Sequence, residues 1–393
     1  MPEKQTALRL ATFGCDEDVL EIVETAIQQE GWDLVACHAP DTYRARLQAL
    51  ALPAEVGEHW ESLLSGEGVD AVIVAARTAQ DESHDDALRK LVNANLPLLV
   101  VMPACEAIVG FELDMIRADH AGIIRPYYKN RQHAVWRQFV SLLRDRGEIT
   151  QLVFERRLAD EDQLVRDIDM IQAIAGPIQK VSAMGSQPED GTLRGVSINM
   201  TSESGILVRW TNVPLPDADA RLSAYTASGE VALTISTKGA WSLESGKTPL
   251  EPVDASAESS VSFVLREFEQ SVRTRQDRGQ WMSVCRAMDI AEIVPTCLRR
   301  GKTMEFHNEQ HSEASSFKGI MAAGGCGMLL LTLATILVAA AVEALHLPFR
   351  HHLWWKLWPV YLVVPILIFL ALQLLQLVAG DADGSSPITT QTK

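Results

Sequence analysis

Residues 69–76 read VDAVIVAA and residues 97–102 read PLLVVM, and these two stretches decide the fold. Each is short and almost entirely apolar, as is typical of a strand that is buried on both faces of a sheet. Further strands are expected at residues 8–13, 32–37 and 122–124, with helices near residues 18–29, 59–64, 85–94 and 106–119. Strands that alternate with helices predict a doubly wound parallel sheet of the Rossmann kind, in an α/β domain over residues 1–125.

The pattern changes after residue 125. Helices are expected at residues 134–146 and 163–175, and short strands at residues 149–156, 179–184, 196–201, 206–210, 221–226 and 231–236. Turn signals such as Ser228-Gly229 separate several of the strands, which favours a mostly antiparallel sheet. Helices at residues 261–275 and 281–298 follow, so residues 126–306 are predicted to form an α+β domain.

Charge and cysteine content exclude some classes of partner. The chain has 393 residues with 51 acidic and 35 basic side chains, for a net charge of −16. Such an acidic chain is not expected to bind nucleic acid, because phosphates are bound by Lys and Arg. The 6 cysteines contain no C-x-x-C pair, which predicts reduced structural thiols and no metal site.

Two long apolar runs near the C-terminus predict a membrane anchor. Residues 319–342 and 357–380 carry no charged side chain, and a membrane-spanning helix needs ~20 apolar residues. A linker (307–318), a transmembrane hairpin (319–380) and a polar tail (381–393) are therefore expected. No signal peptide is recognised at the N-terminus, so we expect a cytoplasmic-membrane protein with its soluble domains in the cytoplasm. Membrane lipid is then one partner, and a membrane protein that packs on Gly324, Gly325 and Gly327 is another.

Several motifs occur in an order that resembles one enzyme family. The stretches that carry the resemblance are WESLL at 60–64, VDAVIVA at 69–75, His84, residues 98–103, the group Asp162, Asp167, Ile168, Asp169 and Gly176, and Trp281 with LRRGK at 298–302. Together they resemble the Gfo/Idh/MocA family of NAD(P)-dependent oxidoreductases, which includes inositol 2-dehydrogenases. The resemblance covers most of residues 7–305. It implies an NAD(P) cofactor, a sugar or polyol as the small-molecule ligand, and a homodimer formed through the second sheet.

The resemblance also implies where the site lies. Its cofactor-binding positions correspond here to Gly14, Cys15, Ala75, His84 and Pro103. Its catalytic positions correspond to Met102, which stands where the family has a lysine, to Arg166, which stands where it has a histidine, and to Asp162 and Asp169.

Three departures from the family pattern argue against the usual reaction. The first turn reads Gly14-Cys15-Asp16-Glu17-Asp18-Val19, so Asp16 and Val19 replace two glycines, and three carboxylates stand where a diphosphate would bind. Met102 can neither donate a hydrogen bond nor carry charge. Arg166 stays protonated and cannot serve as the base that alcohol oxidation requires.

Other positions leave alternatives open. Ala39 stands near the expected ribose-binding acid, and Asp41 could substitute for that acid through a shifted loop. His84 is expected as a capping or packing residue at a helix start, or as a ligand contact. Arg166 is expected either to pair with Asp162 and Asp169 on one helix face or to clamp an anion.

The leading hypothesis is therefore a membrane-anchored Gfo/Idh/MocA-like protein with a degenerate active site and a non-catalytic binding or regulatory role. One alternative is a functional NAD(P)-dependent sugar or polyol oxidoreductase with a rearranged site, in which His38, His84 or His120 supplies the base. The other alternative is a membrane scaffold.

Overall fold

The computed structural model describes residues 6–50, 55–57, 60–65, 68–77, 82–186, 193–246, 248–251, 259–276, 280–306, 330–342, 344–345, 360, 363 and 367. Met1–His307 form one compact unit, and Asn308–Lys393 form a second. Both predicted domains fall within the first unit, and the division between residues 125 and 126 stays a prediction.

The first sheet is parallel, as the apolar runs predict. Its strands are β1 (Leu8–Phe13), β2 (Trp32–His38), β3 (Glu55–Gly57), β4 (Ala71–Val74), β5 (Leu98–Val101) and β6 (Ile124–Tyr127). They are arranged in the order β3-β2-β1-β4-β5-β6, which is a strand order of dinucleotide-binding folds. The topology changes direction between β1 and β4, so a crevice is expected outside the carboxyl ends of these two strands.

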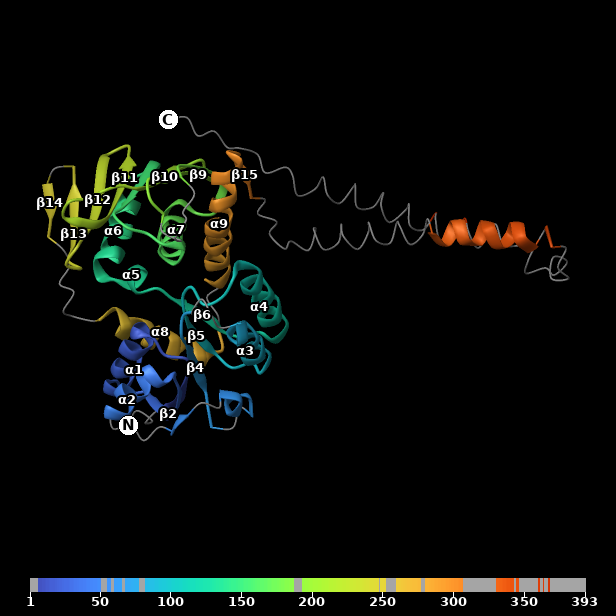
Figure 1. The fold of residues 1–393 in the computed structure, drawn as a ribbon, viewed down its shortest axis with the longest axis horizontal. Coiled ribbons are helices and arrows are strands. Elements are labelled where there is room, and N and C mark those ends of the chain that lie inside the picture. Colours follow the sequence, from blue (N-terminus) through green and yellow to red (C-terminus); the bar gives the residue numbers. More distant parts are fainter. Residues whose placement is uncertain are drawn as a thin grey trace, which may run out of the picture. The chain divides into compact units, whose positions relative to one another are not determined.

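Helices cover both faces of this sheet (Figure 1). They are α1 (Glu17–Gln28), α2 (Asp41–Ala49), the 3-10 helix η1 (Trp60–Ser65), α3 (Glu82–Asn93) and α4 (Ala107–His120). Alternate residues of β4 point to opposite faces: Ala71 and Ile73 belong to one core, and Val72 and Val74 to the other. The sequence predicted the helices except α2, and it predicted η1 as an ordinary helix.

The second sheet follows in the chain. Its strands are β7 (Ile149–Arg156), β8 (Ile178–Met184), β9 (Ser197–Ser202), β10 (Leu207–Asn212), β11 (Ala218–Thr226), β12 (Gly229–Ser236), β13 (Trp241–Ser245), β14 (Thr248–Leu250) and β15 (Met304–Glu305). They are ordered β14-β13-β12-β11-β7-β10-β9-β8-β15. Of these pairs only β10 with β7 is parallel, which confirms the mostly antiparallel prediction.

Five further helices complete the first unit. They are α5 (Lys129–Gln132), α6 (Ala134–Asp145), α7 (Glu161–Ala175), α8 (Ser260–Thr274) and α9 (Trp281–Arg300). Residues of α6, α7 and α9 pack with the apolar side chains of the second sheet.

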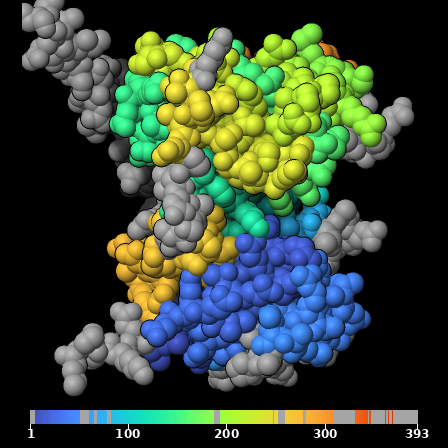
Figure 2. Space-filling view, turned by 90° about the vertical axis from the view of Figure 1, so that its left-hand side faces the viewer, coloured from blue at the N-terminus to red at the C-terminus, as the bar shows by residue number. Residues whose placement is uncertain are grey.

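Helix α8 does not pack with the second sheet, although it follows that sheet in the chain. Its residues Val264 and Phe268 share a core with Leu10 of β1 and Ile22 of α1. The ring of Phe268 stacks on that of Trp32, with centroids 5.8 Å apart. Figure 2 shows this orange segment beside the blue N-terminal segments. A late segment therefore completes the N-terminal half of the fold.

The C-terminal unit corrects the membrane prediction. Within the residues that the structure describes, no helix has the length and apolar character that crossing a membrane requires. The prediction of a two-span cytoplasmic-membrane protein is wrong on this finding. Most of residues 319–380, with Gly324, Gly325 and Gly327, and all of residues 308–318 and 381–393 lie outside the described residues.

A buried ion pair holds α7 on the second sheet. Asp167 is fully buried, and Arg156 of β7 donates to it from Nε at 2.9 Å and also from Nη2. The indole Nε1 of Trp210 donates to the same carboxylate at 2.9 Å, and the amide of Gln163 donates at 3.1 Å. Because the contacts of Asp167 with Arg156 and Trp210 are buried, loss of the carboxylate would leave a buried guanidinium uncompensated.

We predict that Asp167→Ala lowers the free energy of unfolding by about 3–5 kcal/mol, measured by urea denaturation. The matched control is Glu112→Ala, which removes an exposed partner of Arg89 and should cost under about 1 kcal/mol. Equal losses in the two variants would contradict this account.

Candidate functional site

The turn after β1 keeps the first glycine of the predicted motif for a steric reason. Gly14 has φ +76°, and a Cβ added to it would lie 2.8 Å from the Cβ of Ala75, which follows β4. Only glycine accepts both the backbone conformation and the close approach. Gly14 and Ala75, two of the predicted cofactor positions, are therefore in contact.

The carboxylate of Asp16 occupies the N-terminus of α1. Its Oδ1 accepts a hydrogen bond from the backbone N–H of Val19 at 2.7 Å, as an N-cap does. Its Oδ2 accepts from the backbone N–H of Ala76 at 2.9 Å. Backbone N–H groups at a helix N-terminus are the groups that bind a phosphate in related folds. Here the chain's own carboxylate binds them.

The other carboxylates near this turn have cationic partners. Arg46 of α2 binds Glu17 through both oxygens, at 2.6 and 3.2 Å, and these hydrogen bonds lower the pKa of Glu17. Lys129 pairs with Glu21. Burial raises the pKa of Asp18, and the positive charge of Arg166 opposes that rise. The acidic turn is thus balanced by the chain's own cations.

A cleft of about 530 Å³ opens beside this turn. Aromatic and imidazole rings of Phe13, Tyr43, Trp60 and His84 line it, and Asp16 lies in its wall; we call it the ring-lined cleft. The ring centroids of Phe13 lie 5.3 Å from Trp60 and 5.1 Å from His84. Cys15, His38, Ala39 and Ala75 also line the cleft. Four of the five predicted cofactor positions, namely Gly14, Cys15, Ala75 and His84, therefore meet here.

The predicted ribose-binding acid is not replaced by Asp41. Ala39 lies in the wall of the ring-lined cleft, as the position of the missing acid requires. Asp41 has a side chain that is 84% exposed and pairs with Arg44 at 2.9 Å. Its carboxylate is thus committed to a neighbour on the surface of α2.

A second cleft, of about 550 Å³, holds the fifth predicted cofactor position, Pro103, and the predicted catalytic position Asp162. We call it the acidic cleft, because its lining includes Glu106, Glu161, Asp162 and Glu292 beside Arg77. Arg77 pairs with Glu106 at 3.1 Å. Burial raises the pKa values of Glu161, Asp162 and Glu292. The sequence singled out only Asp162, because the glutamates resemble ordinary carboxylates of a helix surface.

The position of the family lysine is closed to ligand. Met102 is 0% exposed and belongs to the apolar core, with its backbone N–H bound to the carbonyl of Tyr127 at 3.2 Å. A side chain packed in this way neither contacts solvent nor lines either cleft.

The three positions on α7 do not form one ion-paired face. Asp169 is 0% exposed and pairs with Arg131 at 2.7 Å, so its partner is not Arg166. Burial raises the pKa of Asp169, and Arg131 opposes that rise. The positive charge of Arg166 acts instead on Asp18 and Asp162, where it opposes the rise in pKa that burial causes. The predicted pairing of Asp169 with Arg166 is wrong, because Asp169 pairs with Arg131.

The described cysteines are buried and unpaired with one another. Burial raises the pKa of Cys15 to about 12 and that of Cys37 to about 11. Both thiols stay protonated at neutral pH and make poor nucleophiles. Cys326 lies outside the described residues.

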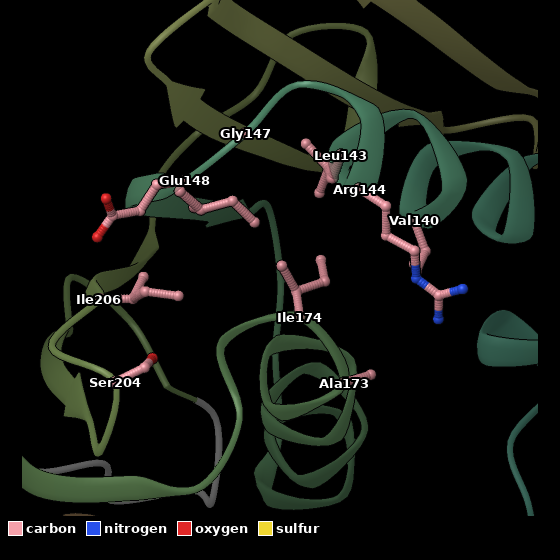
Figure 3. A pocket seen from close by; sticks show the side chains of 10 residues that line it. Val140, Leu143, Arg144, Gly147, Glu148, Ala173, Ile174, Ser204 and Ile206 are labelled. Atoms are coloured by element: carbon pink, nitrogen blue, oxygen red, sulfur yellow. The ribbon is translucent and has the colours of Figure 1, made fainter. Parts of the chain in front are cut away.

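A third hollow, of about 260 Å³, lies between α6, α7 and the start of β7 and is lined mainly by apolar side chains. Figure 3 shows Leu143 and Ile174 pointing toward one another, with the charged ends of Arg144 and Glu148 on opposite sides. None of the residues that the sequence singled out lines it. Across the described residues, no group of three or more His, Cys, Asp or Glu side chains could hold a metal ion.

Solved structures identify the fold. The chain is similar to an aldose-aldose oxidoreductase from Caulobacter crescentus, with a TM-score of 0.64 and 14% identity over 77% of this chain and 100% of that one. It is similar to an oxidoreductase from Agrobacterium radiobacter in complex with NAD+ (TM-score 0.63, 13% identity, 76% and 98% covered). It is also similar to myo-inositol 2-dehydrogenase from Lactobacillus plantarum (TM-score 0.61, 14% identity, 77% and 100% covered).

The chain shares the fold of these oxidoreductases. No protein-family model matches the sequence, and no curated protein matches it. The likeness at these identities is one of fold, and it confirms the fold that the sequence motifs predicted.

We predict that position 102 accepts an apolar side chain and rejects a lysine. Met102→Leu should change the free energy of unfolding by under about 1.5 kcal/mol, because the volume is kept. Met102→Lys should lower it by about 3 kcal/mol or more, because it buries an ammonium group without a partner. Thermal and urea denaturation measure both variants. A Met102→Lys protein as stable as Met102→Leu would contradict the burial of this position.

A second prediction concerns pH. The folded chain holds a proton on Asp169 more tightly than the unfolded chain, whose aspartates titrate near the ordinary value of 3.8. The wild-type free energy of unfolding therefore falls as pH rises from this value through the raised pKa. Asn does not titrate, so the stability of Asp169→Asn relative to wild type should rise over the same window. Urea denaturation at several pH values measures the difference; a difference that falls with pH would mean that pairing with Arg131 outweighs burial.

Proposed function

We propose that this protein uses an oxidoreductase fold to bind a small molecule, in a binding or regulatory role, and does not transfer hydride with NAD(P). The observation that carries the proposal is the position of the Asp16 carboxylate, which accepts the N–H groups of Val19 and Ala76. The N–H of Val19 belongs to the first turn of α1, where dinucleotide-binding folds hold the diphosphate.

One feature of the turn that begins at Gly14 suits a dinucleotide, and two features oppose its binding. Gly14 permits the close approach to Ala75 that such a turn requires. A diphosphate at the start of α1 would, however, have to displace Asp16 from the N–H of Val19, and loss of an N-cap costs about 0.5–2 kcal/mol. It would then lie beside the like charge of Asp16, and this repulsion grows as the local dielectric falls. The residues present therefore do not fit the diphosphate.

The chemistry of alcohol oxidation also lacks a base at the expected place. Met102 is buried and uncharged, and Arg166 remains protonated. Of the histidines that could substitute, His84 is 5% exposed and its ring stacks on Phe13. His120 lies exposed at the end of α4. His38 lines the ring-lined cleft at 9% exposure, and it is the candidate base of the alternative function. The burial of His84 and the surface position of His120 support binding over turnover.

The test is isothermal titration of the full chain with NADH and NADPH. We expect the wild-type protein to bind neither NADH nor NADPH at micromolar concentrations. Asp16→Gly removes the carboxylate and releases both N–H groups, and it should strengthen binding by about tenfold or more. The matched control is Asp119→Asn, which alters an exposed carboxylate near the end of α4 and should change nothing.

Micromolar binding of either cofactor to the wild-type chain would overturn the proposal. So would turnover of sugars or polyols with either cofactor, provided that His84→Ala removes that activity. The second result would favour the alternative of a working oxidoreductase with a rearranged site.

A further inference from the structure

We infer that the ring-lined cleft binds a planar aromatic ligand that is neutral or positively charged and carries no phosphate. This inference rests on the proposed function and names the class of ligand for that site. Neither the acidic cleft nor the apolar hollow is part of it.

The location of the cleft is that of a ligand site. Phe13 ends β1, His38 ends β2 and Ala75 follows β4, and all three line the cleft. They stand at the carboxyl ends of parallel strands, next to the point where the strand order reverses. Open α/β sheets bind their ligands at this place. The volume of about 530 Å³ lies within the range of small-molecule pockets.

The walls favour a flat ring. Phe13 lies between Trp60 and His84, in contact with both rings at centroid distances of 5.3 and 5.1 Å. Tyr43 adds a fourth ring from α2. Stacking on such rings contributes about 0.5–1.5 kcal/mol per ring pair beyond the area that it buries.

The charge of the walls excludes an anion. Of the described residues that line the cleft, none is Lys or Arg, and Asp16 is a carboxylate. The cations close by are already paired, Arg46 with Glu17 and Lys90 with Asp86. Lys90 lies 5.9 Å from the ring centroid of Trp60, so this ring already has a cation partner. The carboxylate of Asp16 would attract a positive group on the ligand and repel a phosphate.

The experiment uses three ligands that share the adenine ring and differ in net charge. The full chain is titrated with adenosine, 5′-amino-5′-deoxyadenosine and adenosine 5′-monophosphate, and heats of binding are measured at two ionic strengths. We expect the amino compound to bind at least as tightly as adenosine, and the monophosphate to bind about tenfold more weakly or worse. Asp16→Asn should reduce the difference in affinity between the three compounds, because it removes the negative charge at position 16 and keeps an N-cap.

Trp60→Ala tests the rings. It should weaken adenosine binding by about tenfold, whereas Trp241→Ala should leave it unchanged. Trp241 is a matched control because its ring stacks on His133 at 4.2 Å in the second sheet, away from the cleft lining. Circular dichroism confirms that each variant is folded, and Asp16→Asn supplies an independent readout if Trp60→Ala is not.

The outcomes separate the inference from the proposed function. If no member of the series binds, or if the monophosphate binds as tightly as adenosine, the inference is wrong while the proposed function stands. If NADH binds at micromolar concentration, the proposed function fails first. If the charge series holds but Trp241→Ala weakens binding as much as Trp60→Ala, the ring-lined cleft is not the site.

Discussion

One carboxylate joins two segments at the edge of the first sheet. Asp16 accepts the N–H of Val19 and that of Ala76, so it joins the start of α1 to the segment after β4. The same contact holds the turn beside Ala75 and supplies an acceptor to the first turn of α1 from within the chain. In the function that we propose, the charge of this side chain limits which ligands can bind at this edge of the sheet.

The sequence predicted the strands well where burial on both faces leaves an unambiguous apolar run, as in β4 and β5. It missed β3 and β14, which have 3 residues each and carry no period that could be recognised. It missed α2, which has Leu47 as its only buried residue, because a helix that buries so little shows no apolar face. The apolar content of residues 319–380 predicted a membrane hairpin, and no helix among the described residues is long and apolar enough to cross a membrane.

The sequence predicted individual residues of the candidate site, but not which of them contact one another. Four of the predicted cofactor positions meet in the ring-lined cleft, because a strand-turn-helix motif fixes them locally. Asp169 was expected beside Arg166, but its partner is Arg131, which lies 38 residues away in sequence. Tertiary partners of this kind, like Glu292 in the acidic cleft, carry no local signal, so the sequence could not reveal them.

The place of α8 has a consequence for the order in which the chain becomes complete during synthesis. Leu10, Ile22 and Trp32 are made at the start, but Val264 and Phe268, which cover them, are made after the whole second sheet. Until residue 274 has left the ribosome, the side chains that α8 covers lack this partner, although α1 already packs on the same face of the sheet. N-terminal domains commonly finish folding first during translation. Here one core of the first sheet is completed only after the whole second sheet has been made.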